Sequence, residues 1–216
     1  MESIGRRVRD ARRRSLSERI EQCGCTAAEE EAAVLLPTRR EGLLLTLFWG
    51  ALIAGIFLCY GMTWRSICGA IFAAALLWLS FLDLRYGMLY DCITLPLALL
   101  GAFFSMAEFL APFESSLLGG ILGGGFFYAL HIISRGGIGG GDVKFALALG
   151  LWLGWEGTAV ALWVAFLLGG AVAAFLLLMG WRRRRDLIPF GPFMALGGYL
   201  GFLYGVQLWN FYEGLM

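Results

Sequence analysis

The sequence lacks the residue patterns that support disulfide-rich and zinc-binding folds. Its five cysteines follow no spacing typical of a disulfide framework, and Cys23 and Cys25 supply two soft ligands where a structural zinc site needs four. The only histidine, His131, stands alone in an apolar run and is interpreted as a hydrogen-bonded packing residue. The first forty residues contain no apolar segment of the kind that forms a signal peptide. No metal, no cofactor and no cleavable leader are therefore expected.

Charged residues are also scarce, at 15% of the 216 residues, whereas 59% are hydrophobic and the mean hydropathy is +0.74. These values lie outside the range of soluble globular proteins. The apolar residues gather in seven consecutive runs: 43–60, 66–82, 93–111, 117–133, 143–155, 158–179 and 190–212. Most approach the ~20 residues that cross ~30 Å of hydrocarbon, while the fifth covers only about 20 Å. The sequence predicts an all-α fold, a polytopic membrane bundle of about seven transmembrane spans without internal repeats.

Residues 1–42 differ from the rest of the chain because they are polar and carry nine arginines. We interpret them as a cytoplasmic, flexible arm that precedes the membrane domain of residues 43–216. Ile4, Val8 and Ala11 would share one face of a helix, so a basic helix lying on anionic lipid remains an alternative.

The distribution of basic residues predicts the orientation in the membrane. With the arm inside, the inner face collects the arm's arginines together with Arg85, Arg135, Lys144 and 182–185, whereas the outer face holds only Arg65. This asymmetry is that of the positive-inside rule. We therefore expect a multi-pass protein of the cell's inner (plasma) membrane, with the amino terminus in the cytoplasm and the carboxyl terminus outside.

A glycine-rich segment at residues 136–141 leads directly into Asp142 and Lys144 at the start of the fifth run. Five glycines within six positions indicate backbone that turns sharply or lies very close to another group. An acid at the edge of a membrane span is costly and indicates a functional site facing a cavity. Asp83, at the inner end of the second run, falls on the same side of the membrane and at a similar depth.

Two carboxyl groups brought together in this way are suited to peptide hydrolysis. They cannot both ionise cheaply, so they share a proton, and the charged one activates water while the protonated one polarises the scissile carbonyl. The helix dipoles would favour Asp142 as the anion, because it opens a span, and Asp83 as the neutral acid, because it closes one.

Three segments in order resemble a known family. Residues 137–155, GIGGGDVKFALALGLWLGW, resemble the Gly-x-Gly-Asp-x-Lys signature of the type IV prepilin leader peptidases, which are intramembrane aspartic peptidases. Residues 82–96, LDLRYGMLYDCITLP, resemble the segment that carries that family's first catalytic aspartate. Residues 188–198, IPFGPFMALGG, resemble its carboxyl-terminal stretch.

The resemblance implies an inner-membrane aspartic endopeptidase that removes the short basic leader from type IV prepilins or pseudopilins at the cytoplasmic face. On the matching positions, Asp83 and Asp142 are the catalytic pair. Gly139 and Gly141 shape the loop, and Lys144 tunes the charge of the site. The implied partners are the pilin-like substrates and the lipid bilayer; no nucleic acid is expected, and neither the oligomeric state nor the pilus, secretion or competence system served is predicted.

The chain departs from the family's pattern at two places. Tyr90–Asp91 stands where the family often has Pro–Asp, and it resembles the Tyr-Asp of presenilin and signal-peptide-peptidase relatives, which makes Asp91 an alternative first acid. Asp83 is preferred because its surroundings follow the prepilin pattern. The two Cys-x-x-Cys pairs associated with N-methylation in long bacterial members are missing, so a peptidase without methyltransferase activity is expected.

Simpler readings of the same residues stay open. Asp142 could only cap a helix, Asp83 and Arg85 could form an interfacial ion pair, and the glycines of residues 119–125 are interpreted as a helix-packing surface. A small transporter or channel using Asp83 and Asp142 for cation or proton binding is the alternative function. Transporter sites usually lie near the midplane between repeated halves, whereas both acids here are placed at one edge.

Overall fold

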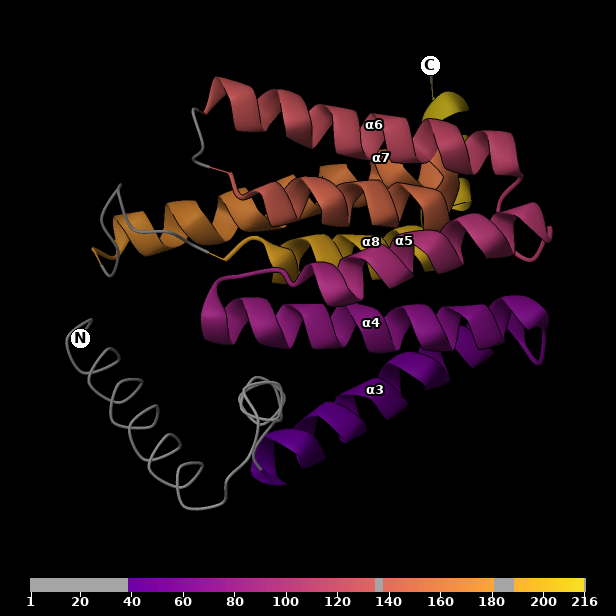
Figure 1. Cartoon of the computed structure of the whole chain (residues 1–216), viewed down its shortest axis with the longest axis horizontal. Helices are drawn as coiled ribbons and strands as arrows, with labels where there is room; N and C mark the ends of the chain where they lie inside the picture. The colour runs from indigo at the N-terminus through magenta and orange to yellow at the C-terminus, as the bar shows by residue number, and fades with distance from the viewer. Residues whose placement is uncertain (1–38, 135–137, 181–188, 216) are drawn as a thin grey trace. The chain divides into compact units, whose positions relative to one another are not determined.

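The computed structural model describes residues 39–134, 138–180 and 189–215, and residues 45–216 form one compact unit. Within the described residues all regular structure is helical: α3 (Arg39–Tyr60), α4 (Trp64–Tyr86), α5 (Asp91–Met106), α6 (Phe113–Ile133), α7 (Gly140–Leu178) and α8 (Gly191–Glu213) (Figure 1). The predicted arm lies almost entirely outside these residues, as do Arg135 and residues 182–185 of the predicted inner face.

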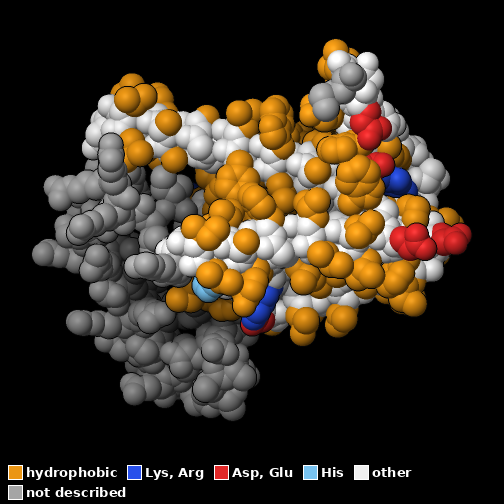
Figure 2. Space-filling model, turned by 90° about the horizontal axis from the view of Figure 1, so that it is seen from above, with side chains coloured by type: hydrophobic (Ala, Val, Ile, Leu, Met, Phe, Trp, Pro, Cys, Tyr) orange, Lys and Arg blue, Asp and Glu red, His pale blue; other side chains and the backbone are white. Residues whose placement is uncertain are grey.

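Four of the described helices have the length and composition of membrane-spanning segments. Among the described residues, α3, α4, α6 and α7 are long and apolar enough to cross a bilayer, and α5 is a shorter apolar helix. Figure 2 shows a face covered mainly by hydrophobic side chains, with charged ones confined to small groups. Exposed side chains such as Leu58 (87%) and Ile133 (77%) would be unfavourable in water but suit lipid. The chain is therefore a helical membrane protein.

Helix α7 doubles back on itself at Gly154. This glycine has φ 72° and ψ 177°, which is not helical. A Cβ added to Gly123 of α6 would lie 2.6 Å from the carbonyl oxygen of Ala146 and 3.3 Å from Cγ2 of Thr158. In a straight helix those two residues would stand about 18 Å apart. The two arms of α7 thus run in opposite directions (Figure 1), and the reversal occurs at the last residue but one of the fifth predicted apolar run.

Glycines allow α6 and α7 to pack backbone against backbone. A Cβ on Gly119 would lie 2.6 Å from the carbonyl oxygen of Gly150, and Gly150 has the reciprocal contact with Gly119. Gly120, Gly123 and Gly124 also face atoms of α7, so the predicted helix-packing role of these glycines is confirmed. The prediction was wrong for Gly125, which has nothing within 4 Å and faces open space.

Buried aromatic side chains tie the bundle together in its interior. The indole of Trp152 stacks on Phe72 of α4 with 4.9 Å between ring centroids, and its Nε1 donates a 2.7 Å hydrogen bond to the carbonyl of Leu97 in α5. Phe145 of α7 is fully buried. Because successive helices alternate in direction, the end of α4 and the starts of α5, α7 and α8 all lie at one end of the bundle (left in Figure 1). This end carries the residues that the sequence singled out.

Candidate active site

Asp83 lies in the last turn of α4, where the helix is ended by Gly87. Gly87 adopts a left-handed conformation (φ 67°) and donates its backbone N–H to the carbonyl of Asp83, a common C-terminal cap. Asp83 is 6% exposed. Its Oδ2 accepts a 2.7 Å hydrogen bond from the backbone N–H of Gly191, the first residue of α8. A buried carboxylate is thereby provided with a hydrogen-bond donor from a distant helix.

Asp142 lies in the first turn of α7, three residues after the N-cap residue Gly139. Its Oδ2 accepts a 3.1 Å hydrogen bond from the backbone N–H of Gly139, which is one half of a capping box, because glycine has no side chain that could accept a bond in return. Asp142 is therefore not itself the N-cap, although it does satisfy one of the helix's free donors. Asp142 thus contributes to the cap of α7 from the third helical position and not as the N-cap residue, which does not exclude a second role for its carboxylate.

The two acids come together from different helices. Asp83 and Asp142 are close enough for the charge of one to act on the carboxyl of the other. Fifty-nine positions separate them in the chain, so only the packing of α4 against α7 and α8 produces this proximity. Two nearby carboxyls, one buried and one partly buried, repel when both are ionised, which is the condition for sharing one proton.

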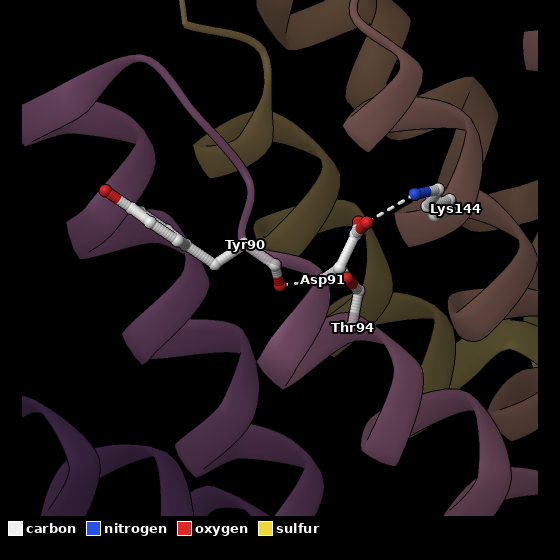
Figure 3. A network of polar contacts seen from close by, with 4 residues as sticks. All are labelled: Tyr90, Asp91, Thr94 and Lys144. Carbon is white, nitrogen blue, oxygen red and sulfur yellow. Dashed lines mark hydrogen bonds and ion pairs between the residues drawn. The ribbon is translucent and has the colours of Figure 1, made fainter. Parts of the chain in front are cut away.

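Asp91, the alternative first acid, has a different neighbour. It opens α5 and forms an ion pair with Lys144 of α7, with 2.5 Å between Nζ and Oδ2 (Figure 3). Both side chains are more than half exposed, at 62% for Asp91 and 58% for Lys144. Thr94 supports the start of α5 by donating a 3.0 Å hydrogen bond from Oγ1 to the carbonyl of Tyr90. The predicted site residue Lys144 therefore pairs directly with Asp91.

The predicted loop glycines occupy a region of close approach. A Cβ on Gly141 would lie 2.9 Å from Cβ and 3.2 Å from the carbonyl oxygen of Leu89, which precedes α5. A Cβ on Gly139 would lie 3.3 Å from Oδ2 of Asp142. The connection between α4 and α5 thus lies directly against Gly141, the residue before Asp142. This agrees with the close backbone approach expected from the sequence.

Two further contacts at this end were not predicted. Gly191 lies in the third family-like segment, but nothing in its sequence context indicated that it contacts Asp83. His131 at the end of α6 forms a 2.6 Å hydrogen bond through Nδ1 with the carbonyl of Ile138, so the expected packing histidine also holds the segment that leads into α7. In the parts of the chain that the structure describes, no group of three or more His, Cys, Asp or Glu side chains is arranged to hold a metal ion.

Comparison with known proteins bears on this arrangement. The sequence model of the type IV leader peptidase family matches residues 70–174, a range that includes Asp83, Asp91, Asp142 and Lys144. The chain belongs to the type IV leader peptidase family. The family match ends before α8, so it does not include Gly191.

Several similar proteins carry the name prepilin leader peptidase/N-methyltransferase. One from Burkholderia pseudomallei is 34% identical over 77% of this chain and 55% of its own length. One from Neisseria gonorrhoeae is 30% identical over 86% of this chain and 63% of its own. A third, from Xanthomonas campestris, is 31% identical over 69% of this chain and 54% of its own. The chain thus spans somewhat more than half the length of these leader peptidase relatives. No solved structure is significantly similar to it.

Proposed function

We propose that this protein is a membrane aspartic endopeptidase that removes the leader peptide from type IV prepilins or pseudopilins, with Asp83 and Asp142 as its catalytic pair. The observation that carries the proposal is the placement of these two carboxyls near each other at one end of the bundle, in the last turn of α4 and the first turn of α7. Membership of the type IV leader peptidase family supports the same reaction. Asp91 is not assigned to the pair, because it is mostly exposed and forms an ion pair with Lys144, whereas Asp83 is buried and lies near Asp142.

The chemistry needs one charged and one protonated carboxyl. The ionised carboxylate takes a proton from a water molecule as the water oxygen attacks the scissile carbonyl carbon, and the protonated acid gives its proton to the carbonyl oxygen. Collapse of the tetrahedral intermediate breaks the C–N bond, and the leaving amine takes up a proton from the pair. The backbone amides of Gly191 and Gly139 each hold one oxygen of an acid, which restricts the orientation of both carboxyls.

Seven spans are proposed for the membrane domain, because the reversal at Gly154 divides α7 into two passes. An odd number of spans places the termini on opposite sides. Arg85 and Lys144 lie on the elements that carry the two acids, whereas Arg65 lies at the start of α4, at the other end of that helix. By the positive-inside rule, the acids face the cytoplasm and the amino terminus is cytoplasmic, in the inner membrane.

The relatives' names also include an N-methyltransferase activity, and the proposal does not extend to it. The roles proposed for Asp83 and Asp142 concern peptide hydrolysis alone. The transporter alternative is not favoured by the comparisons, since the matching family and relatives are peptidases by name.

The direct test is cleavage of a pilin-like reporter, a short basic leader followed by an apolar helix, by the purified protein in detergent. We expect leader release that continues in the presence of a metal chelator, unlike that of a zinc peptidase whose bound water depends on the ion. An intact reporter after incubation with correctly folded protein would overturn the peptidase proposal. Proton or cation flux in proteoliposomes without any cleavage would favour the transporter instead.

A further inference from the structure

The start of α8 contacts Asp83 through a single backbone group. The N–H of Gly191 donates a 2.7 Å hydrogen bond to Oδ2 of Asp83, and the two residues are 108 positions apart in the chain. Both residues are buried. The first N–H groups of a helix have no partner within the helix, so this donor is available to an outside acceptor. Asp83 is thus held by α8 as well as by its own helix.

Gly191 leaves no room for a side chain on the side that faces Asp83. An added Cβ would lie 2.6 Å from Oδ2 and 3.0 Å from both Cβ and Cγ of Asp83. Gly191 does not have a positive φ, so its backbone conformation is open to alanine. The glycine is therefore required by the neighbouring carboxyl group and not by a turn.

The residues around Gly191 fix where its N–H points. Pro192 follows it in the first turn of α8, a position where proline is favoured because the missing N–H would have no helical partner. Phe190 precedes it and packs against Phe166 of α7, with 5.2 Å between ring centroids, and against Phe127 of α6 at 5.8 Å. Contacts with three helices thus anchor the start of α8 beside Asp83.

We propose that Gly191 is a positioning residue for the peptidase reaction: its N–H and its lack of a side chain together hold the Asp83 carboxyl in the orientation that meets Asp142. The inference rests on the proposed function, since it assigns to Gly191 a part in that same site. It also gives the third family-like segment, residues 188–198, a part in the same site as the two segments that carry the acids.

The test compares two alanine substitutions in the same helix. Gly191→Ala should lower kcat by roughly 10- to 100-fold, the effect of displacing a reacting group by about 1 Å, with little change in KM. Gly198→Ala is the matched control, because its added Cβ would lie 2.7 Å from a side-chain atom, Cδ2 of Leu149, but touches no part of Asp83. A purely structural role for Gly191 predicts equal losses of kcat in the two variants, and that result would overturn the proposal.

A second measurement covers the case in which Gly191→Ala fails to fold. Phe190–Gly191 is the only Phe-Gly pair in the sequence, so labelling with ¹³C′-phenylalanine and ¹⁵N-glycine isolates one amide signal by nuclear magnetic resonance. Its proton should move upfield in Asp83→Ala, which removes the acceptor, and stay in place in Asp91→Ala. An unchanged signal in Asp83→Ala would show that the hydrogen bond is absent.

The two proposals fail in different ways. If the wild-type protein leaves the reporter intact, the peptidase function itself is wrong. If the wild-type protein cleaves and Gly191→Ala cleaves at the same rate, only the positioning role of Gly191 is wrong.

Discussion

The Nζ atom of Lys144 lies 2.5 Å from Oδ2 of Asp91, and this ion pair joins the start of α7 to the start of α5. One turn away on the same face of α7, Gly141 meets Leu89 at close range. The connection between α4 and α5 is therefore attached to the first turn of α7 at two points. Asp142 lies between Gly141 and Lys144 in the sequence, so both contacts set the position of the turn that carries it.

Neutralising either member of the proposed catalytic pair should stop cleavage. Asp83→Asn and Asp142→Asn are nearly isosteric, but an amide cannot exchange the proton that the reaction moves. We expect each to lower the cleavage rate by roughly 10²- to 10⁴-fold, the usual contribution of general acid–base catalysis. Reporter cleavage by purified variants with unchanged elution and melting behaviour measures this. Activity surviving Asp142→Asn would remove the aspartic mechanism.

Breaking the ion pair should have a much smaller effect. An exposed pair such as Asp91–Lys144 contributes about 0–1 kcal/mol, so Asp91→Asn and Lys144→Gln should each keep activity within about fivefold of the wild type. The swapped variant, Asp91→Lys with Lys144→Asp, should restore part of any loss. An inactive Asp91→Asn beside an active Asp83→Asn would transfer the first acid to the Tyr-Asp pair.

The backbone contact between α6 and α7 should tolerate no side chain. A Cβ on Gly150 would lie against the carbonyl of Gly119, which cannot move aside as a flexible side chain would. Gly150→Ala should therefore destabilise the protein by about 1–3 kcal/mol or more, measured as a lower melting temperature in detergent. Gly125→Ala is the control, since Gly125 faces open space and alanine favours helix by up to ~1 kcal/mol. Equal melting temperatures for the two variants would contradict this packing.

The orientation can be measured at the two ends of α6. In a background without the native cysteines, single cysteines at Glu114 and Ser134 place one thiol near each end of this helix. An impermeant maleimide added to intact cells should label position 114 and leave position 134 unlabelled, because the acids are proposed to face the cytoplasm. The reverse pattern would put Asp83 and Asp142 on the wrong side for a leader peptidase.

Most of the helices could be predicted from the sequence, because the bilayer sets the same requirement for each membrane-spanning segment separately. A span must be apolar over a set length, so the runs of hydrophobic residues predicted the helices without knowledge of their neighbours. The reversal at Gly154 lies within a few residues of the boundary predicted between the fifth and sixth runs. The acids Asp83 and Asp142 stood out because a carboxyl at the edge of an apolar segment is costly to keep.

Which groups meet at the site was decided by the tertiary structure. Nothing local to Gly191 indicates that its N–H reaches Asp83, and the Lys144–Asp91 pair joins residues 53 positions apart. The sequence indicated that the glycines of residues 119–125 form a packing surface. Only the contacts with α7 show that Gly125 faces open space while the other glycines of this segment are packed. Composition and spacing show whether a single segment is apolar and long enough to span the membrane. Contacts between segments depend on how every helix packs against the others, and that information is spread over the whole chain.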